Sequence, residues 1–246
     1  MDNKLISIIT PSYNQGEFIE ETIKSVLNQT YQNFEYIIYD SCSNDNTNKI
    51  LEKYKDNSKI KIFIEKDNGQ TDAINKGFRR AKGELVGWIN SDDILDENCL
   101  YNIVNAYKDN KDKSIFYGDI ETIDIKGNKI KDIISDNDIS YNSLLFENPQ
   151  VVQPGSFYNK DLVDKIGYLD ESLNFVMDYD LWIRLVEQKD SCKVNKILAK
   201  FRLHNESKTM GQGNTKKFWK EIYWVRKNSK KITDIEKLEE IKRDHR

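Results

Sequence analysis

The chain has 246 residues, which is enough for one sizeable core with a short appendage. Its 38% hydrophobic and 32% charged residues are typical of a globular protein and exclude a disordered or fibrous one. The formal net charge of -3 gives no overall attraction to nucleic acid, so we expect no nucleic-acid partner.

The cysteines and the lengths of the apolar runs indicate in which cellular compartment the protein is expected to function. Cys42, Cys99 and Cys192 are far apart and lack CxxC spacing, so neither a disulfide framework nor a zinc cluster is predicted. The apolar run at 5–9 is too short for a signal peptide, and the sequence has no run of about 18 apolar residues that could span a membrane. We therefore expect a cytoplasmic protein, with any membrane contact peripheral and on the inner face.

Strand-like and helix-like segments alternate over the first half of the chain, which is typical of βαβ units and a parallel sheet. The expected buried strands are 5–10, 34–40, 60–65 and 85–90. Apolar residues at helical spacing predict crossover helices over 17–28 and 70–81. This pattern predicts an α/β fold.

The second half departs from that alternation. Residues 114–119 have the pattern of another strand, and 120–131 alternate around Lys126-Gly127-Asn128 as a hairpin does, so we expect a mixed, mostly parallel sheet. We expect a main domain over 1–210 and a helical C-terminal tail over 211–246.

The predicted tail carries an apolar stripe made of Phe218, Trp219, Ile222 and Tyr223. Such a stripe leaves three fates open. It can pack on the main domain, form a homodimer or lie on a membrane surface.

A polar cluster follows each expected strand in the first half. The clusters are Pro11-Ser12-Tyr13-Asn14, Asp40-Ser41, Asp67-Asn68-Gly69 and Asn90-Ser91-Asp92-Asp93. Because the carboxyl ends of strands in an open α/β sheet form the ligand crevice, we expect these clusters to converge. Neither G-x-G-x-x-G nor G-x-x-x-x-G-K-[ST] is present, which argues against a Rossmann dehydrogenase and a P-loop NTPase.

Asp92 and Asp93 place adjacent carboxylates at the end of a hydrophobic strand. Carboxylate oxygens suit magnesium or manganese, and such an ion would neutralise a diphosphate. Taken alone, an Asp-Asp pair is more often a turn or a helix cap. Its interpretation therefore depends on the segments around it.

Five segments occur in a fixed order along the chain. They are Pro11-Ser12-Tyr13-Asn14, the stretch 40–47, the stretch 69–77, Asn90-Ser91-Asp92-Asp93 and Met177-Asp178-Tyr179-Asp180-Leu181-Trp182. Together they resemble a family 2 glycosyltransferase with a GT-A fold, over roughly residues 5–205. The resemblance implies an inverting, non-processive enzyme of bacterial polysaccharide or cell-surface glycan synthesis. Such an enzyme passes a sugar from a nucleotide diphosphate donor, usually a UDP-sugar, to an acceptor hydroxyl.

The resemblance also implies nucleotide-binding residues. Thr10 and Tyr13 match the positions that cup the nucleobase, and Asp40 matches the carboxylate that hydrogen-bonds the base, usually uracil. Asp72 lies in a stretch resembling a donor-side loop, although helix N-capping explains it equally well. Asp92 matches the motif that contacts the ribose and diphosphate.

A divalent metal site, for Mn²⁺ or Mg²⁺, is implied for Asp92, Asp93 and His204. The family often has Asp where this chain has Asn90, so the sequence leaves open which carboxylate binds the ion directly. The other histidine, His245, lies in the charged tail, which leaves His204 as the imidazole candidate. A purely structural histidine is the alternative.

Asp178 matches the family's general base, and its alternative role is to N-cap the helix that follows. Met177 stands where the family more often has Glu, which removes a charge that could tune the pKa of Asp178. The segment 153–157 resembles an acceptor-side lining, and a turn into a strand is an equal alternative. The sequence has no Gln-x-x-Arg-Trp motif, so it does not resemble the processive synthases.

Two other functions are alternatives to sugar transfer. An inactive nucleotide-sugar-binding scaffold in a glycan assembly complex would not need Asp92, Asp93, Asp178 and His204 together. A nucleotidyltransferase usually needs a glycine-rich N-terminal phosphate loop, which 11–16 does not resemble. The expected partners are a nucleotide-sugar donor and a hydroxyl acceptor such as a glycan or lipid-linked glycan. The sequence does not name the sugar, the acceptor or the linkage.

Overall fold

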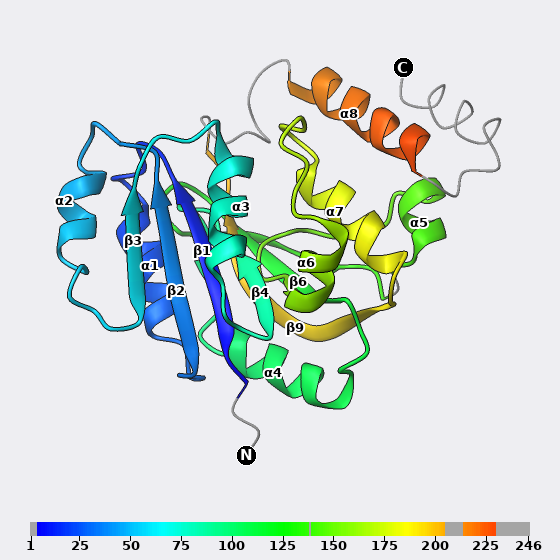
Figure 1. The fold of residues 1–246 in the computed structure, drawn as a ribbon, viewed down its shortest axis with the longest axis horizontal. Coiled ribbons are helices and arrows are strands. Elements are labelled where there is room, and N and C mark those ends of the chain that lie inside the picture. The colour runs from blue at the N-terminus through cyan, green and yellow to red at the C-terminus, as the bar shows by residue number, and fades with distance from the viewer. Residues whose placement is uncertain (1–3, 138, 205–213, 230–246) are drawn as a thin grey trace.

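A computed structural model of the chain describes residues 4–137, 139–204 and 214–229. Its centre is a nine-stranded sheet with helices on both faces (Figure 1). The strands are β1 (Ile6–Ser12), β2 (Phe34–Asp40), β3 (Ile60–Ile64), β4 (Leu85–Trp88), β5 (Ile94–Leu95), β6 (Ile115–Ile123), β7 (Lys129–Ile133), β8 (Phe157–Asn159) and β9 (Ser191–Arg202). The helices are α1 (Ile19–Leu27), α2 (Thr47–Glu52), α3 (Gln70–Arg80), α4 (Cys99–Asp109), α5 (Tyr141–Phe146), α6 (Lys160–Ile166), α7 (Met177–Val186) and α8 (Asn214–Asn228).

The sheet is mixed, as predicted. Its order is β3-β2-β1-β4-β8-β6-β9-β5, with β7 paired to β6. The first four strands pair in parallel, and β8 joins them antiparallel beside β4. The parallel register sets Ser12 of β1 opposite Asp40 of β2, so the ends of these two strands lie side by side.

Alternation along the buried strands divides the core between the two faces of the sheet. Ile8 packs in the cluster formed with α1, α2 and α4, whereas its neighbour Ile9 packs in the cluster formed with α3, α7 and α8. A Cβ on Gly77 of α3 would lie 2.6 Å from the Ile9 side chain. Glycine therefore lets α3 approach β1 closely, which brings the start of α3 next to the strand ends.

The strands predicted for the first half are confirmed, with ends that shift by at most two residues. The prediction for 114–131 was wrong in one respect, because β6 runs unbroken from Ile115 to Ile123. The predicted hairpin turn follows it, where Asp124 Oδ1 accepts hydrogen bonds from the backbone N–H groups of Lys126 and Asn128.

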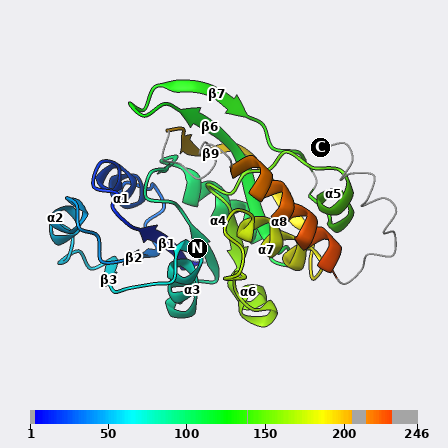
Figure 2. The same ribbon diagram turned by 90° about the horizontal axis from the view of Figure 1, so that it is seen from above.

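The helix predicted within the tail 211–246 is present as α8, and it lies beside α7 and α5 (Figures 1 and 2). Ile222 and Val225 belong to the same core cluster as residues of α7, while Phe218 is 37% exposed. Of the three possibilities left open for the stripe, the structure shows packing on the main domain. The packed face includes Ile222 and Val225, so it lies nearer the C-terminal end of α8 than the predicted stripe. The predicted boundary at 210/211 and the tail residues 230–246, His245 included, lie outside the described residues.

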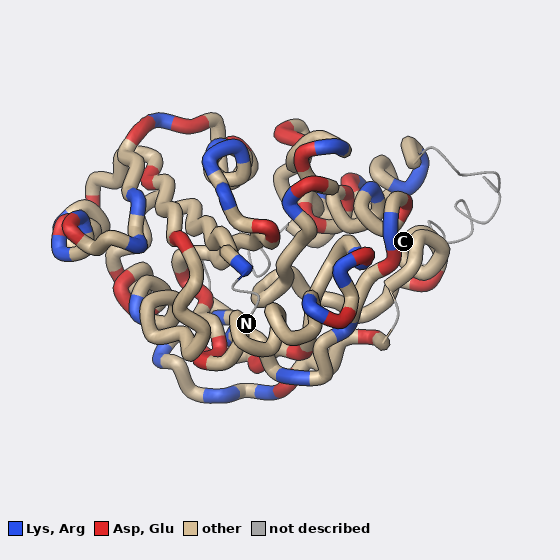
Figure 3. The backbone as a smooth tube through the Cα atoms, turned by 60° about the horizontal axis from the view of Figure 1, so that its bottom comes forward, with Lys and Arg blue, Asp and Glu red and all other residues tan. Residues whose placement is uncertain are grey.

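Basic and acidic residues alternate along the described part of the backbone, with no long stretch of a single sign (Figure 3). Among residues 4–137, 139–204 and 214–229, no helix has the length and apolar character needed to cross a bilayer.

Candidate active site

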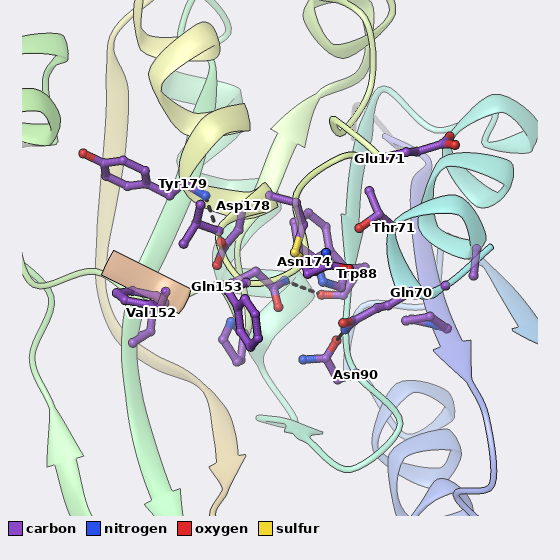
Figure 4. A pocket seen from close by; sticks show the side chains of 18 of the residues that line it. Gln70, Thr71, Trp88, Asn90, Val152, Gln153, Glu171, Asn174, Asp178 and Tyr179 are labelled. Atoms are coloured by element: carbon purple, nitrogen blue, oxygen red, sulfur yellow. Dashed lines mark hydrogen bonds between the residues drawn. The ribbon is translucent and has the colours of Figure 1, made fainter. Parts of the chain in front are cut away.

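A cavity of about 960 Å³ opens at the carboxyl ends of β1 and β4. We call one wall the sheet side, formed by the lining residues of 11–15, 41, 67–73, 88–92, 201 and 204. We call the other the helix side, formed by the lining residues of 148–154, 171–182 and α8. Figure 4 shows both, with Gln70 and Asn90 facing Gln153 and Asp178. The predicted convergence of the strand-end clusters is confirmed.

Thr10 and Tyr13, both predicted to contact a nucleobase, lie in different surroundings. Thr10 is fully buried, its Oγ1 donates to the Ile89 carbonyl at 2.9 Å, and it lies 2.8 Å from the Tyr36 hydroxyl. Tyr13 lines the cavity and is 59% exposed. The structure therefore brings Tyr13 to the cavity wall and leaves Thr10 beneath it.

Asp40 also lies beneath the sheet side. It is fully buried, and its carboxylate accepts hydrogen bonds from Ser12 Oγ at 3.0 Å, Ser43 N at 2.8 Å and Ser43 Oγ at 2.6 Å. Because Ser12 lines the cavity, Asp40 holds a cavity residue in place from behind.

Asp72 lines the cavity from the first turn of α3. The N-cap of that helix is Gly69, whose φ of 117° is readily adopted by glycine, so Asp72 is not itself the N-cap. Its carboxylate accepts a hydrogen bond from Asn68 N at 2.9 Å and lies 3.4 Å from Lys76 Nζ. A carboxylate in the first turn is stabilised by the helix dipole.

The adjacent carboxylates Asp92 and Asp93 have opposite surroundings. Asp92 lines the cavity, and its Oδ2 lies 2.9 Å from His204 Nε2. Asp93 is fully buried, and its oxygens accept from Arg202 N at 2.9 Å and from Asn90 Nδ2 at 3.3 Å. Burial, followed by the nearby charge of Asp92, raises the pKa of Asp93 well above its usual value.

The predicted trio of metal ligands is therefore not assembled. Within 4–137, 139–204 and 214–229, no group of three or more His, Cys, Asp or Glu side chains is placed to hold a metal. Asp93 drops out of the predicted set because its carboxylate is buried and its oxygens bond to protein groups. The sequence left open which of the two carboxylates binds directly, and only Asp92 is on the cavity wall.

Asp92 and His204 nevertheless fit a divalent ion as two of its ligands. Oxygen ligands lie about 2.1 Å from Mg²⁺ in octahedral geometry, so neighbouring ligand atoms are about 3 Å apart. The 2.9 Å between Asp92 Oδ2 and His204 Nε2 matches that spacing. The His204 ring is fixed by Phe18, with ring centroids 5.0 Å apart.

Asp178 lines the helix side from the first turn of α7 and points into the cavity (Figure 4). The N-cap of α7 is Val176, so Asp178 does not take the alternative role of helix cap. Asp178 Oδ1 accepts a hydrogen bond from Tyr179 N at 2.8 Å. Asp180 does not line the cavity and instead pairs with Arg184 at 2.6 Å.

The segment 153–157 leads from the cavity into β8, as the turn interpretation predicted. Gln153 and Pro154 line the cavity, and Gln153 Nε2 donates to the Trp88 carbonyl at 2.8 Å. This bond ties the helix side to the end of β4. Gly155 has a φ of 80°, which allows the turn.

The contribution of α8 to the cavity was missed by sequence reasoning. Its lining residues are Phe218, Trp219, Ile222 and Arg226. The apolar stripe signalled a buried face but gave no sign that this face borders the cavity. Arg226 gave no signal at all, because a basic residue in a charged helix is normally solvated. It is nevertheless only 2% exposed.

The chain matches the family model Glycosyl transferase family 2 over residues 7–167. An uncharacterised glycosyltransferase of Rickettsia conorii is 33% identical over 216 residues. That alignment covers 82% of this chain and 34% of the relative, so the chain spans about a third of the relative's length.

Two solved structures share the fold. Residues 1–349 of S. aureus TarS in complex with UDP-GlcNAc superpose with a TM-score of 0.72 at 18% identity, covering 94% of this chain and 69% of that fragment. A mannosyltransferase from Pyrobaculum calidifontis in complex with GDP-Man and Mn²⁺ gives a TM-score of 0.62 at 15% identity, covering 86% of this chain and 59% of that protein. These likenesses confirm the predicted GT-A-type α/β fold.

Proposed function

The chain belongs to glycosyltransferase family 2, and on that premise we propose that it transfers a sugar from a UDP-sugar to an acceptor hydroxyl with inversion at the anomeric carbon. One observation carries the proposal. A single cavity holds the Asp92–His204 pair on its sheet side and the carboxylate of Asp178 on its helix side. A displacement needs both, because the leaving group and the attacking hydroxyl lie on opposite sides of the anomeric carbon.

The sheet side would bind the nucleotide. Tyr13 offers an exposed aromatic ring on which a base can stack. Thr10 and Asp40 would act from behind, since Asp40 holds Ser12 and the Thr10 hydroxyl fixes the end of β1 against Ile89. The UDP-GlcNAc bound to TarS, which has the same fold, supports a uridine nucleotide as the donor.

Asp92 and His204 would hold Mn²⁺ or Mg²⁺, and the Mn²⁺ in the mannosyltransferase structure supports this. When bound, the ion neutralises charge on the departing diphosphate. Among the described residues of the cavity wall, the only Lys or Arg is Arg226, and it lies on the helix side. The sheet side therefore offers no described side-chain cation for the diphosphate, and a divalent ion would supply that positive charge.

Asp178 would accept the proton of the attacking hydroxyl. The bond from Tyr179 N holds its Oδ1, so the carboxylate is oriented before the acceptor arrives. The acceptor oxygen then bonds to the anomeric carbon as the bond to the diphosphate oxygen breaks, and the proton ends on Asp178. Attack from the helix side with departure toward the sheet side gives inversion.

We place this reaction in the cytoplasm. Cys42, Cys99 and Cys192 are all free thiols, as a reducing compartment favours.

The test is a thermal-shift and turnover panel of UDP- and GDP-sugars with Mn²⁺ or with chelator. We expect UDP-sugars to raise the melting temperature only when the metal is present. Without an acceptor, we expect slow transfer of the sugar to water, which hydrolyses the donor and releases UDP. Equal binding in chelator would refute the metal assignment. Binding with no UDP release under any acceptor mixture would favour the inactive scaffold.

A further inference from the structure

We propose that the helix side of the cavity is built for an acceptor that carries an anionic group, a phosphate or a carboxylate, and that Arg226 of α8 binds this group. The inference rests on the proposed function, since it names the class of acceptor for the same site. The support comes from the charge of the cavity wall, the hydrogen bonds of Arg226 and the position of Asp178.

The charge of the cavity wall is strongly uneven. Its described lining contains five acidic residues, namely Asp67, Asp72, Asp92, Glu171 and Asp178. Arg226 is the single Lys or Arg among the described lining residues. For an anionic ligand group on the helix side, Arg226 is therefore the one described lining side chain of opposite charge.

The hydrogen bonds of Arg226 leave the Nη1 group of its guanidinium unused. A guanidinium has five N–H groups, and Arg226 donates from Nε to the Tyr179 hydroxyl at 2.7 Å and from Nη2 to the Leu144 carbonyl and Asn148 Oδ1. Its Nη1 is buried and has no hydrogen-bond partner.

All three acceptors of Arg226 are uncharged oxygens, and no described carboxylate lies within ion-pair distance of its side chain. Arg226 is 2% exposed, and a buried cation is costly unless an anion or further hydrogen bonds compensate it. An anionic group of a ligand would supply both the charge and the acceptor that Nη1 lacks. Arginine is suited to this task because its planar fork binds carboxylates and phosphates in a fixed geometry.

The surroundings of Arg226 orient its side chain. The guanidinium lies 5.7 Å from the centroid of the Tyr179 ring, which also accepts its Nε hydrogen bond. One turn and two turns before it on α8, Ile222 and Trp219 also line the cavity. They offer an apolar surface beside the cation on which the carbon skeleton of the acceptor can rest.

The connection to the proposed base is short. Tyr179 follows Asp178 directly, and the two side chains leave the first turn of α7 in different directions (Figure 4). Asp178 points into the cavity, while the Tyr179 hydroxyl meets Arg226. An acceptor anchored by its anion at Arg226 would thus lie along the wall that carries the base.

The experiment uses the full chain preloaded with UDP and Mn²⁺, so that the sheet side is occupied and cannot bind a phosphate probe. Glycerol 3-phosphate and glucuronate are the anionic probes, and glycerol and glucose are their neutral counterparts. We expect each anionic probe that fits to bind at least about tenfold more tightly than its counterpart, because bonds to charged groups are the stronger ones. The tighter of the two anions identifies phosphate or carboxylate. Equal binding of anionic and neutral probes would overturn the inference.

Variants locate the preference on Arg226. Arg226→Gln should lose it, and Arg226→Lys, which keeps the charge without the fork, should retain part of it. Arg184→Gln is the matched control, because Arg184 is an arginine of α7 paired with Asp180 that does not line the cavity. This variant should keep the full preference, and a loss equal to that of Arg226→Gln would refute the assignment. UDP binding is measured in the same wild-type samples. Its absence would refute the proposed function, whereas UDP binding without an anion preference would refute only this inference.

Discussion

The two sides of the cavity are held in place by different means. Most residues of the sheet side follow parallel strands whose backbone register is continuous, as where Ser12 lies opposite Asp40 and Ile9 opposite Trp88. The helix side is held largely by side-chain bonds between helices and loops, such as those from Arg226 to α5 and α7. Sheet register places the residues of the sheet side, whereas a few side chains place those of the helix side. Single substitutions should therefore separate donor binding from transfer.

The largest separation is expected for Asp178→Asn. Asn keeps an acceptor for Tyr179 N but cannot take a proton at neutral pH. Transfer should fall by on the order of 10²–10⁴-fold, the usual contribution of a general base. UDP affinity with Mn²⁺ should stay close to wild type, because the sheet side is untouched. Initial rates at saturating donor and acceptor, with calorimetry of UDP, test this.

Asp180→Asn is the matched control for that substitution. Asp180 pairs with Arg184 away from the cavity, and the amide of an Asn would turn one of its two acceptor oxygens into a donor beside the guanidinium. Its loss should lower the melting temperature and leave the transfer rate at saturation nearly unchanged. Transfer by Asp178→Asn at the rate of the Asp180→Asn control would show that Asp178 is not the base.

The next largest effect compares Asp92 with Asp93. Asp92→Asn should weaken metal-dependent UDP binding by on the order of 10²-fold, because it removes a charged ligand from the cavity wall. Asp93→Asn should instead cost about 1–3 kcal/mol of stability, since an amide cannot satisfy both Arg202 N and Asn90 Nδ2 as the carboxyl does. Calorimetry and denaturant unfolding on both variants separate the two outcomes. Equal loss of metal dependence in both would place Asp93 back among the ligands.

The same contrast explains what the sequence could predict. The convergence of the polar clusters could be predicted because each follows a strand of apolar residues, and strand ends meet at one edge of a parallel sheet. Asp92 and Asp93 are alike in sequence, and their different surroundings depend on partners about a hundred residues away, His204 for Asp92 and Arg202 for Asp93. Which of two adjacent carboxylates faces a cavity depends on such tertiary contacts.

The helix side was predicted less well for the same reason. Asp178 was identified by resemblance, and its alternative role as a helix cap does not hold because the N-cap of α7 is Val176, two residues earlier. Arg226 bonds to residues 47 and 82 positions away, Tyr179 and Leu144. No local pattern marks an arginine as buried, so its place could be found only in the fold.

A smaller effect is expected on the sheet side from Tyr13→Ala. Stacking of a base on an aromatic ring contributes about 1–3 kcal/mol, so UDP affinity should fall by roughly tenfold. Tyr13 is 59% exposed, so the melting temperature should not change. Tyr101→Ala, at a tyrosine of α4 that is 53% exposed and not on the cavity wall, should leave UDP affinity intact. Identical UDP affinity in both variants would remove Tyr13 from the nucleotide site.

The smallest effect concerns how α8 holds the helix side. The Glu221 carboxylate accepts a hydrogen bond from Phe175 N at 2.8 Å. It also accepts from Asn174 N, which lies 3.2 Å from one carboxylate oxygen and 3.1 Å from the other. Both residues line the cavity just before Asp178, so one carboxylate fastens the loop that leads into α7.

Glu221→Gln keeps one carboxyl-type oxygen but loses the charge and the second acceptor. Because part of this contact is exposed, solvent screening limits the loss to about 1 kcal/mol of unfolding free energy. Lys217→Gln changes a charge at an exposed position of the same helix and should have no measurable effect on stability. UDP affinity should be unchanged in both variants, since the sheet side does not contact Glu221. If denaturant unfolding of Glu221→Gln matched that of Lys217→Gln, the contact would not stabilise the loop. The helix side would then depend on Arg226 and the apolar face of α8 instead.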